Sequence, residues 1–155
     1  MPTRTLTIRY EELSTDELSR DERRISAAAR SAAGRAYAPY SRFSVGAAAL
    51  LADGSLVASS NLENAAFPQC LCAEATLLGT LHGQHPGVAI ELLAVAARDH
   101  AGEWVRAAPC GSCRQQLFEA ERRQRSPYTL LLSYGEGAAV RLGSVRDLLP
   151  MGFAF

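Results

Sequence analysis

Cys72-Ala73-Glu74 is the segment from which the rest of this sequence is interpreted, together with a second segment, Pro109-Cys110-Gly111-Ser112-Cys113. Cys110 lies 38 positions after Cys72. The thiolates of Cys72, Cys110 and Cys113 can bind one zinc ion. A structural zinc usually takes four protein ligands, whereas a catalytic zinc takes three and leaves the fourth position to water. The pattern therefore predicts a zinc site, with Zn2+ as cofactor, that carries out a hydrolytic reaction.

Glu74 gives this site a candidate for proton transfer, because it follows one ligand by two positions without being a ligand itself. A catalytic zinc lowers the pKa of a bound water from about 16 toward about 7. A carboxylate within hydrogen-bond reach can accept the proton of that water and pass it to a leaving group. The sequence therefore assigns Glu74 as the catalytic residue.

Two other interpretations of the cysteines remain open. Cys70, the fourth cysteine, could complete a closed four-cysteine site in a non-catalytic, zinc-stabilised domain, although Glu74 would then have no purpose. Cys110 and Cys113 could form a redox pair, as C-x-x-C does in some cytosolic proteins, although that chemistry needs neither Cys72 nor Glu74.

The composition is that of one globular domain. The chain has 155 residues, of which 48% are hydrophobic and 21% charged, so we expect a single domain over 1–155 with 1–13 as an N-terminal extension. Sixteen basic residues balance sixteen acidic ones, which favours a small-molecule partner over nucleic acid or a membrane. Neither a secretory signal nor an apolar run of about 20 residues is present, so we expect a cytoplasmic protein.

The pattern of hydrophobic residues and turns predicts strands that alternate with helices. The alternation in 3–10 predicts an edge strand, and Asp53-Gly54 predicts a hairpin. The expected strands are 3–10, 45–52, 55–60, 88–97, 128–133 and 139–143, and the expected helices are 15–36, 73–81 and 111–125. This order predicts an α/β fold in three layers. Both ligand segments fall at helix starts, where backbone amides and the helix dipole stabilise thiolates.

Residues 36–153 resemble the small zinc-dependent cytidine deaminases of the homotetrameric type. The resemblance is carried by the two cysteine motifs and by three further segments, which are Ala38-Pro39-Tyr40-Ser41-Arg42-Phe43-Ser44-Val45-Gly46-Ala47-Ala48, Asn61-Leu62-Glu63-Asn64 and Leu149-Pro150-Met151-Gly152-Phe153. It implies a three-layer α/β/α fold with a mixed central sheet. It also implies hydrolytic deamination of cytidine and 2′-deoxycytidine to the uracil nucleosides and ammonia, a step of pyrimidine salvage.

The resemblance implies a role for each substrate-binding position. Phe43 would stack on the pyrimidine, and Asn61 and Glu63 would bind the sugar hydroxyls. Ala73 would contact the substrate as well, and Phe153 would reach the site of a neighbouring subunit. A nucleoside is thus the implied small-molecule partner, and a homotetramer, or alternatively a homodimer, is the implied assembly.

Two positions depart from the family pattern. Ala75 stands where family members commonly carry an arginine that offsets the charge of the thiolates, and Phe67 stands where they often have tyrosine. Arg114 is a candidate for the missing cation. Blasticidin-type deaminases share the cysteine motifs and sometimes lack the arginine, so another amidine-bearing nucleoside is the alternative substrate. The segment 61–64 favours a substrate with an intact sugar, because groups built to bind hydroxyls reject molecules that lack them.

Overall fold

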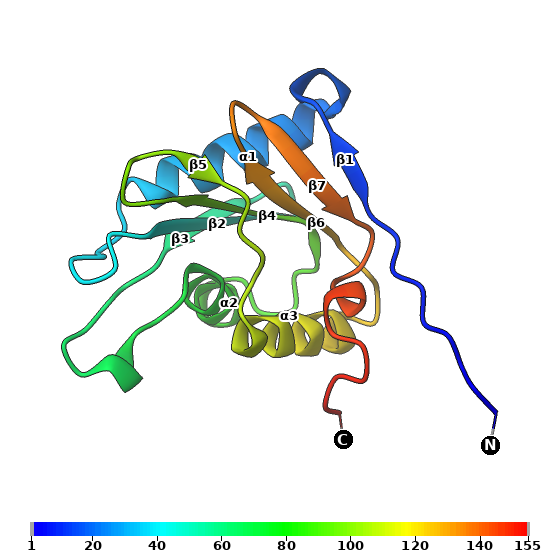
Figure 1. The fold of residues 1–155 in the computed structure, drawn as a ribbon. Helices are drawn as coiled ribbons and strands as arrows, with labels where there is room; N and C mark the ends of the chain where they lie inside the picture. Colours follow the sequence, from blue (N-terminus) through cyan, green and yellow to red (C-terminus); the bar gives the residue numbers. More distant parts are fainter. Residues whose placement is uncertain (1, 155) are drawn as a thin grey trace.

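One mixed β-sheet forms the middle layer of the molecule (Figure 1). The computed structural model describes residues 2–154. The strands are β1 (Glu11–Leu13), β2 (Ser44–Leu51), β3 (Leu56–Ser60), β4 (Ile90–Arg98), β5 (Trp104–Val105), β6 (Thr129–Tyr134) and β7 (Ala138–Leu142). They follow the order β1-β7-β6-β4-β2-β3, with β5 paired to β4. Only the β4 and β6 pairing is parallel among the described strands.

Helices cover both faces of the sheet, which confirms the predicted three-layer α/β fold. Helix α1 (Arg20–Ala33) lies on one face, and α2 (Ala73–Gln84) and α3 (Gly111–Gln124) lie together on the other (Figure 1). Short 3-10 turns occupy Thr15–Glu17, Phe67–Gln69 and Val145–Leu148. Within residues 2–154, no helix has both the length and the apolar character needed to cross a lipid bilayer.

Helix α1 is shorter at both ends than the predicted 15–36. Leu18 is extended and buried, so the chain turns there before the helix begins. A capping box then starts α1, because the Glu22 amide donates to the Ser19 hydroxyl while the Ser19 amide donates to the Glu22 carboxylate. Gly34 caps the other end.

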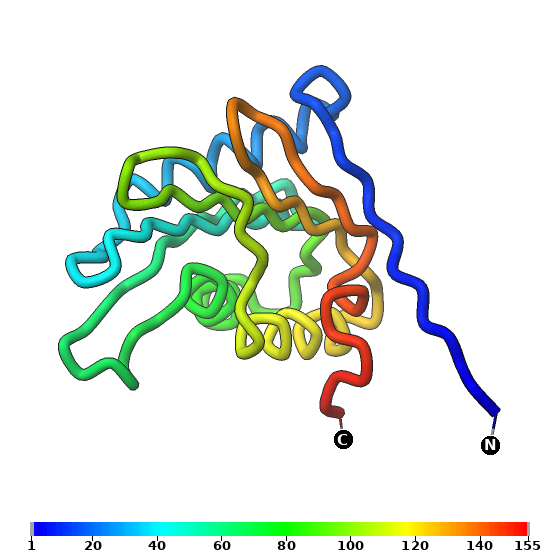
Figure 2. Tube along the Cα trace, in the orientation of Figure 1, coloured from blue at the N-terminus to red at the C-terminus, as the bar shows by residue number. Residues whose placement is uncertain are grey.

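The strand predicted over 3–10 is wrong. The edge strand is β1, which pairs antiparallel with β7 through Glu11–Leu13. Strand β7 ends at Leu142, which by register lies opposite Tyr10, so the chain before Tyr10 has no neighbouring strand to bond with and runs outward from the sheet (Figure 2). Its apolar residues Leu6, Ile8 and Tyr10 are exposed.

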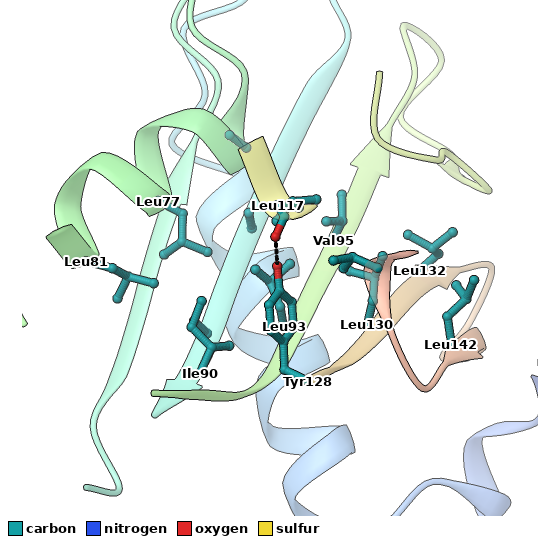
Figure 3. Packing of buried hydrophobic residues seen from close by; sticks show 14 of the residues in the cluster. Leu77, Leu81, Ile90, Leu93, Val95, Leu117, Tyr128, Leu130, Leu132 and Leu142 are labelled. Atoms are coloured by element: carbon teal, nitrogen blue, oxygen red, sulfur yellow. Dashed lines mark hydrogen bonds between the residues drawn. The ribbon is translucent and has the colours of Figure 1, made fainter. Parts of the chain in front are cut away.

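The larger core lies between the sheet and helices α2 and α3 (Figure 3). Leu77 of α2 and Leu117 of α3 are fully buried against Leu93 and Leu130 of the central strands. The buried Tyr128 hydroxyl donates to the Leu117 carbonyl at 3.0 Å. Each such apolar side chain contributes about 1.5–3 kcal/mol on burial, so this core fixes both helices against the sheet.

The other face depends on one glycine. A Cβ atom on Gly46 of β2 would lie 1.9 Å from the Ala29 carbonyl oxygen and 2.5 Å from the Ala33 amide nitrogen of α1. Only glycine allows the helix backbone to approach the strand this closely. Helix α1 therefore packs tightly on β2 two residues after that strand begins.

A buried ion pair joins α1 to the edge of the sheet. Glu22 is only 4% exposed, and its carboxylate accepts from the Ser19 amide at 2.8 Å and from Arg141 Nη1 at 2.9 Å. Burial opposes ionisation of Glu22, but the bonds from Ser19 and Arg141 outweigh it and hold the pKa below its ordinary value. Arg141 also donates to Glu11 of β1.

We expect Glu22→Gln to destabilise the protein at pH 7 by about 1–3 kcal/mol, since Arg141 loses a buried charged partner. A depressed folded-state pKa contributes stability above the unfolded value of about 4.3, and that stability is lost as the pH falls through the folded pKa. The difference between variant and wild type should therefore shrink below about pH 4. Urea unfolding at pH 7 and pH 3.5 measures this, and an equal difference at both pH values would contradict it.

Candidate active site

The three cysteines of the motif meet where α2 and α3 begin. Cys72 is the N-cap of α2, Cys110 is the N-cap of α3, and Cys113 lies in the first turn of α3. Their Sγ atoms all lie within 4.8 Å of one another, and Cys72 Sγ is 4.0 Å from Cys110 Sγ. This is the only such group of three histidine, cysteine or acidic residues within 2–154.

The spacing of the sulfur atoms fits a tetrahedral metal ion. With zinc–sulfur bonds of about 2.3 Å, neighbouring sulfurs of a tetrahedron lie about 3.8 Å apart. The Cys72 to Cys110 distance of 4.0 Å is close to that value. Three sulfurs supply three corners and leave the fourth open, as in a catalytic zinc site.

Without a bound cation, the surroundings favour the neutral form of Cys72 and Cys113. Burial raises the pKa of Cys113, and the Glu74 carboxylate raises it further. Burial likewise raises the pKa of Cys72. At Cys110 burial acts in the same direction, but hydrogen bonds from the amide and the thiol of Cys113 outweigh it and lower the pKa. A divalent ion is therefore what would let all three ionise together.

Cys70 stands outside this cluster. Its Sγ accepts from the Asn64 amide at 3.3 Å, and it does not join the three sulfurs that lie within 4.8 Å of one another. The closed four-cysteine site is therefore not formed. The redox alternative also fits poorly, because Cys110 and Cys113 share their cluster with Cys72 instead of forming a separate pair.

Glu74 lies beside the cluster and is 4% exposed. Burial raises the pKa of its carboxyl group, and hydrogen bonds to its own backbone amide and to the Cys113 side chain partly oppose this. The carboxyl group lines the same pocket as Cys72 and Cys110. A carboxyl group whose pKa is raised takes up and releases a proton more readily near neutral pH than an ordinary one, which suits general acid–base catalysis.

A pocket of about 350 Å3 opens over the cluster. Among the positions predicted to bind substrate, Phe43, Asn61, Glu63 and Ala73 all line it. Its volume lies in the range of about 300–1,000 Å3 that is usual for small-molecule sites. The loops that carry Phe43 and Glu63 leave the sheet at the same end, as the cyan and green segments of Figure 2 show.

The predicted sugar-binding residues are held in place by the backbone around them. Asn61 Oδ1 accepts from the Val45 amide at 2.8 Å, and Asn61 Nδ2 donates to the Phe43 carbonyl at 3.0 Å. The Glu63 carboxylate accepts from the Tyr40 amide at 2.9 Å and from the Ser41 amide at 3.3 Å. Both side chains are thus fixed before any ligand arrives.

Phe153 does not line the pocket above the three cysteines of its own chain. It is 64% exposed, and its backbone exchanges two hydrogen bonds with the Gln115 amide group, at 2.9 and 3.1 Å. It borders a separate groove along α2 and α3. Phe155, which the sequence suggested as a second aromatic for burial against a partner, lies outside the described residues.

Several pocket residues were not identified from the sequence. Val95 of β4 forms part of the floor, Ala107 and Ala108 precede the second cysteine motif, and Ser41 lies on the rim. Val95 lay within a buried strand pattern that gives no sign of a site. Ser41 lies in the segment 38–48, two residues before Phe43, and this position is the one sequence feature that could have indicated that it lines the pocket.

Arg114, the cation that the sequence suggested as counter-charge for the thiolates, lies beside the cluster and bonds to backbone oxygens there. Its Nε donates to the Pro109 carbonyl at 2.8 Å and its Nη1 to the Leu148 carbonyl at 3.2 Å. Within residues 2–154, its hydrogen bonds therefore go to backbone oxygens beside the cluster. The amide of Cys113, which donates to Cys110 Sγ at 3.5 Å, stabilises that sulfur.

Known proteins are similar to this chain in sequence and in fold. Residues 19–128 match the family model described as the cytidine and deoxycytidylate deaminase zinc-binding region. Cytidine deaminase from Mycobacterium tuberculosis is 42% identical over 125 residues, 81% of this chain and 84% of the relative. The crystal structure of cytidine deaminase from Burkholderia pseudomallei superposes with a TM-score of 0.71 at 36% identity, covering 88% of this chain and all of that one. The chain therefore belongs to the cytidine and deoxycytidylate deaminase family.

Proposed function

We propose that the protein is a zinc-dependent hydrolase that converts cytidine and 2′-deoxycytidine to uridine and 2′-deoxyuridine, with release of ammonia. The observation that carries this proposal is the buried Glu74 beside three converging sulfur atoms at the end of a nucleoside-sized pocket. Family membership and the cytidine deaminases at 42% and 36% identity support it. The reaction would serve pyrimidine salvage.

The mechanism assigns zinc to Cys72, Cys110 and Cys113. When bound there, the ion supplies Lewis-acid chemistry that makes water a nucleophile near neutral pH. Glu74 takes one proton from the attacking water and delivers it to the ring nitrogen, and then takes the second proton from the added hydroxyl and delivers it to the departing amino group. A carbon–oxygen bond forms, the carbon–nitrogen bond to the amino group breaks, and ammonia leaves.

The other pocket residues orient the nucleoside. Phe43 stacks on the base and Ala73 contacts it. Glu63 accepts a hydrogen bond from a sugar hydroxyl, and Asn61 can donate to the sugar and accept from it. Each retains bonding capacity for this role. A carboxylate offers about four acceptor positions, and an amide group offers two donors and two acceptor positions, of which the backbone occupies only some.

The proposed assembly is a homotetramer, with a homodimer as the alternative. Large apolar side chains are exposed near the pocket mouth and at the C-terminus, more than a soluble monomer usually leaves uncovered. They are Tyr37, Tyr40, Leu62, Phe67, Leu71, Met151 and Phe153. In such an assembly Phe153 would complete the site of a neighbouring subunit.

We also propose that the chain acts as one deaminase domain and works in the cytoplasm. A single sheet runs through the described residues from β1 to β3, which supports one domain. All four cysteines are free thiols, a state that a reducing compartment maintains.

Glu74→Gln should lower kcat for cytidine by at least about 10²- to 10⁴-fold, because the variant cannot accept a proton. Zinc content should stay at one ion per chain. The measurement is ammonia release from cytidine, deoxycytidine and free cytosine by zinc-loaded protein. Wild-type protein that releases no ammonia from either nucleoside would overturn the proposed substrate, and other amidine-bearing nucleosides such as blasticidin-type compounds would then be tested.

Cys113→Ser should abolish stoichiometric zinc binding, because it removes a buried ligand. Cys70→Ser is the matched control and should retain one zinc ion per chain, since Cys70 lies outside the cluster. Zinc is measured by atomic absorption after gel filtration. Loss of zinc from the Cys70 variant would restore the closed four-cysteine site.

Mixing two inactive variants tests the assembly. Phe153→Ala protomers keep Glu74, and Glu74→Gln protomers keep Phe153, so we expect co-refolded mixtures to regain activity at sites that combine both. Sedimentation should show the wild-type protein as a tetramer. Mixtures that stay as inactive as the separate variants, in protein that does assemble, would exclude a shared site.

A further inference from the structure

The Ser41 side chain connects two parts of the pocket that bind different parts of a nucleoside. Its hydroxyl donates to Glu63 Oε1 and accepts from the Phe43 amide at 3.0 Å. Its own amide donates to Glu63 Oε2 at 3.3 Å. One serine therefore joins the carboxylate assigned to the sugar to the backbone of the aromatic assigned to the base.

The bonding of Glu63 leaves it one orientation. Oε2 accepts from the amides of Tyr40 and Ser41, which use both of its usual acceptor positions. Oε1 accepts from the Ser41 hydroxyl, which leaves one acceptor position on that oxygen. The Ser41 hydrogen bond also holds the pKa of Glu63 below its ordinary value, so the group is an anion. The remaining acceptor position is the one available to a sugar hydroxyl.

The backbone at Phe43 is fixed from both sides. Asn61 Nδ2 donates to the Phe43 carbonyl, and the Phe43 amide donates to Ser41. Arg42, between Ser41 and Phe43, has a φ of 54°, a left-handed conformation that an arginine rarely adopts. Such a conformation persists when surrounding bonds hold it, and the Ser41 and Asn61 bonds are on either side of it.

We infer that Ser41 is a positioning residue for substrate binding, which aims the free acceptor position of Glu63 at the sugar. The inference rests on the proposed function. Because Ser41 touches neither the sulfur cluster nor Glu74, its contribution falls on substrate binding and not on the chemical step. It makes the enzyme select nucleosides that carry the sugar hydroxyl bound by Glu63.

The test is a double-mutant cycle on deoxycytidine with Ser41→Ala, Glu63→Ala and the double variant. We expect Ser41→Ala to raise KM roughly tenfold, the effect of losing a hydrogen bond to a charged group, with kcat within about twofold of wild type. In the Glu63→Ala background the same change should raise KM by less than about threefold, since the partner is gone. With 2′,3′-dideoxycytidine, which lacks the 3′-hydroxyl, Ser41→Ala should likewise change KM by less than about threefold.

Two variants control for a general loss of structure. Ser44→Ala removes the same hydroxyl three residues later, at a side chain with no hydrogen bond to the described residues, and should leave KM unchanged. Ser41→Thr keeps the hydroxyl and should restore most of the affinity. Zinc content and the melting temperature should match wild type in both Ser41 variants.

The outcomes separate this inference from the proposed function. Wild-type protein that is inactive on deoxycytidine defeats the proposed function, and the inference with it. Active wild-type protein with an equal KM increase for Ser41→Ala in both backgrounds, or on both substrates, leaves the function standing and overturns the role of Ser41. If Glu63→Ala does not fold, the comparison of deoxycytidine with dideoxycytidine decides the matter alone.

Discussion

The meeting of two helix N-termini at one end of the sheet is the constraint on which the rest of this structure depends. The three sulfurs converge only because α2 and α3 begin side by side, at Cys72 and Cys110. Their positions are set by a core below them, in which Leu77 and Leu117 are fully buried against the central strands. The packing of the two helices on the sheet therefore sets the positions of the sulfur atoms, and the ligands come from rigid elements.

The pocket holds two carboxylates in opposite environments. Glu74 is buried, and burial raises its pKa, whereas Glu63 is reached by solvent and its pKa is lowered by the hydrogen bond from Ser41. The first environment favours a group that gains and loses a proton, and the second favours a permanent anion that accepts hydrogen bonds. The two environments shift the pKa values of the two carboxyl groups in opposite directions. One group is thereby suited to proton transfer and the other to substrate binding.

The cysteine motifs correctly predicted that the zinc ligands lie at helix starts, because the start of a helix depends mainly on residues that are close together in the sequence. C-x-E and P-C-x-x-C place ligands at helix starts, and both helices begin as predicted. The alternation in 3–10 indicated a strand, but it could not show that β7 stops at Leu142 and leaves no neighbour. The start of α1 depended on the burial of Leu18, a tertiary contact. Ser41 was missed because its partner Glu63 lies 22 residues away.

The order of the ligands along the chain has a consequence for how the protein is made. Cys72 and Cys110 are 38 residues apart, separated by α2, β4 and β5, so no metal site exists until that segment has folded back on itself. All three ligands nevertheless leave the ribosome before β6 and β7, the strands that complete the sheet on one side of β4. An ion bound at that stage would hold α2 against α3 before their core is closed. The folding yield would then depend on the supply of zinc during synthesis.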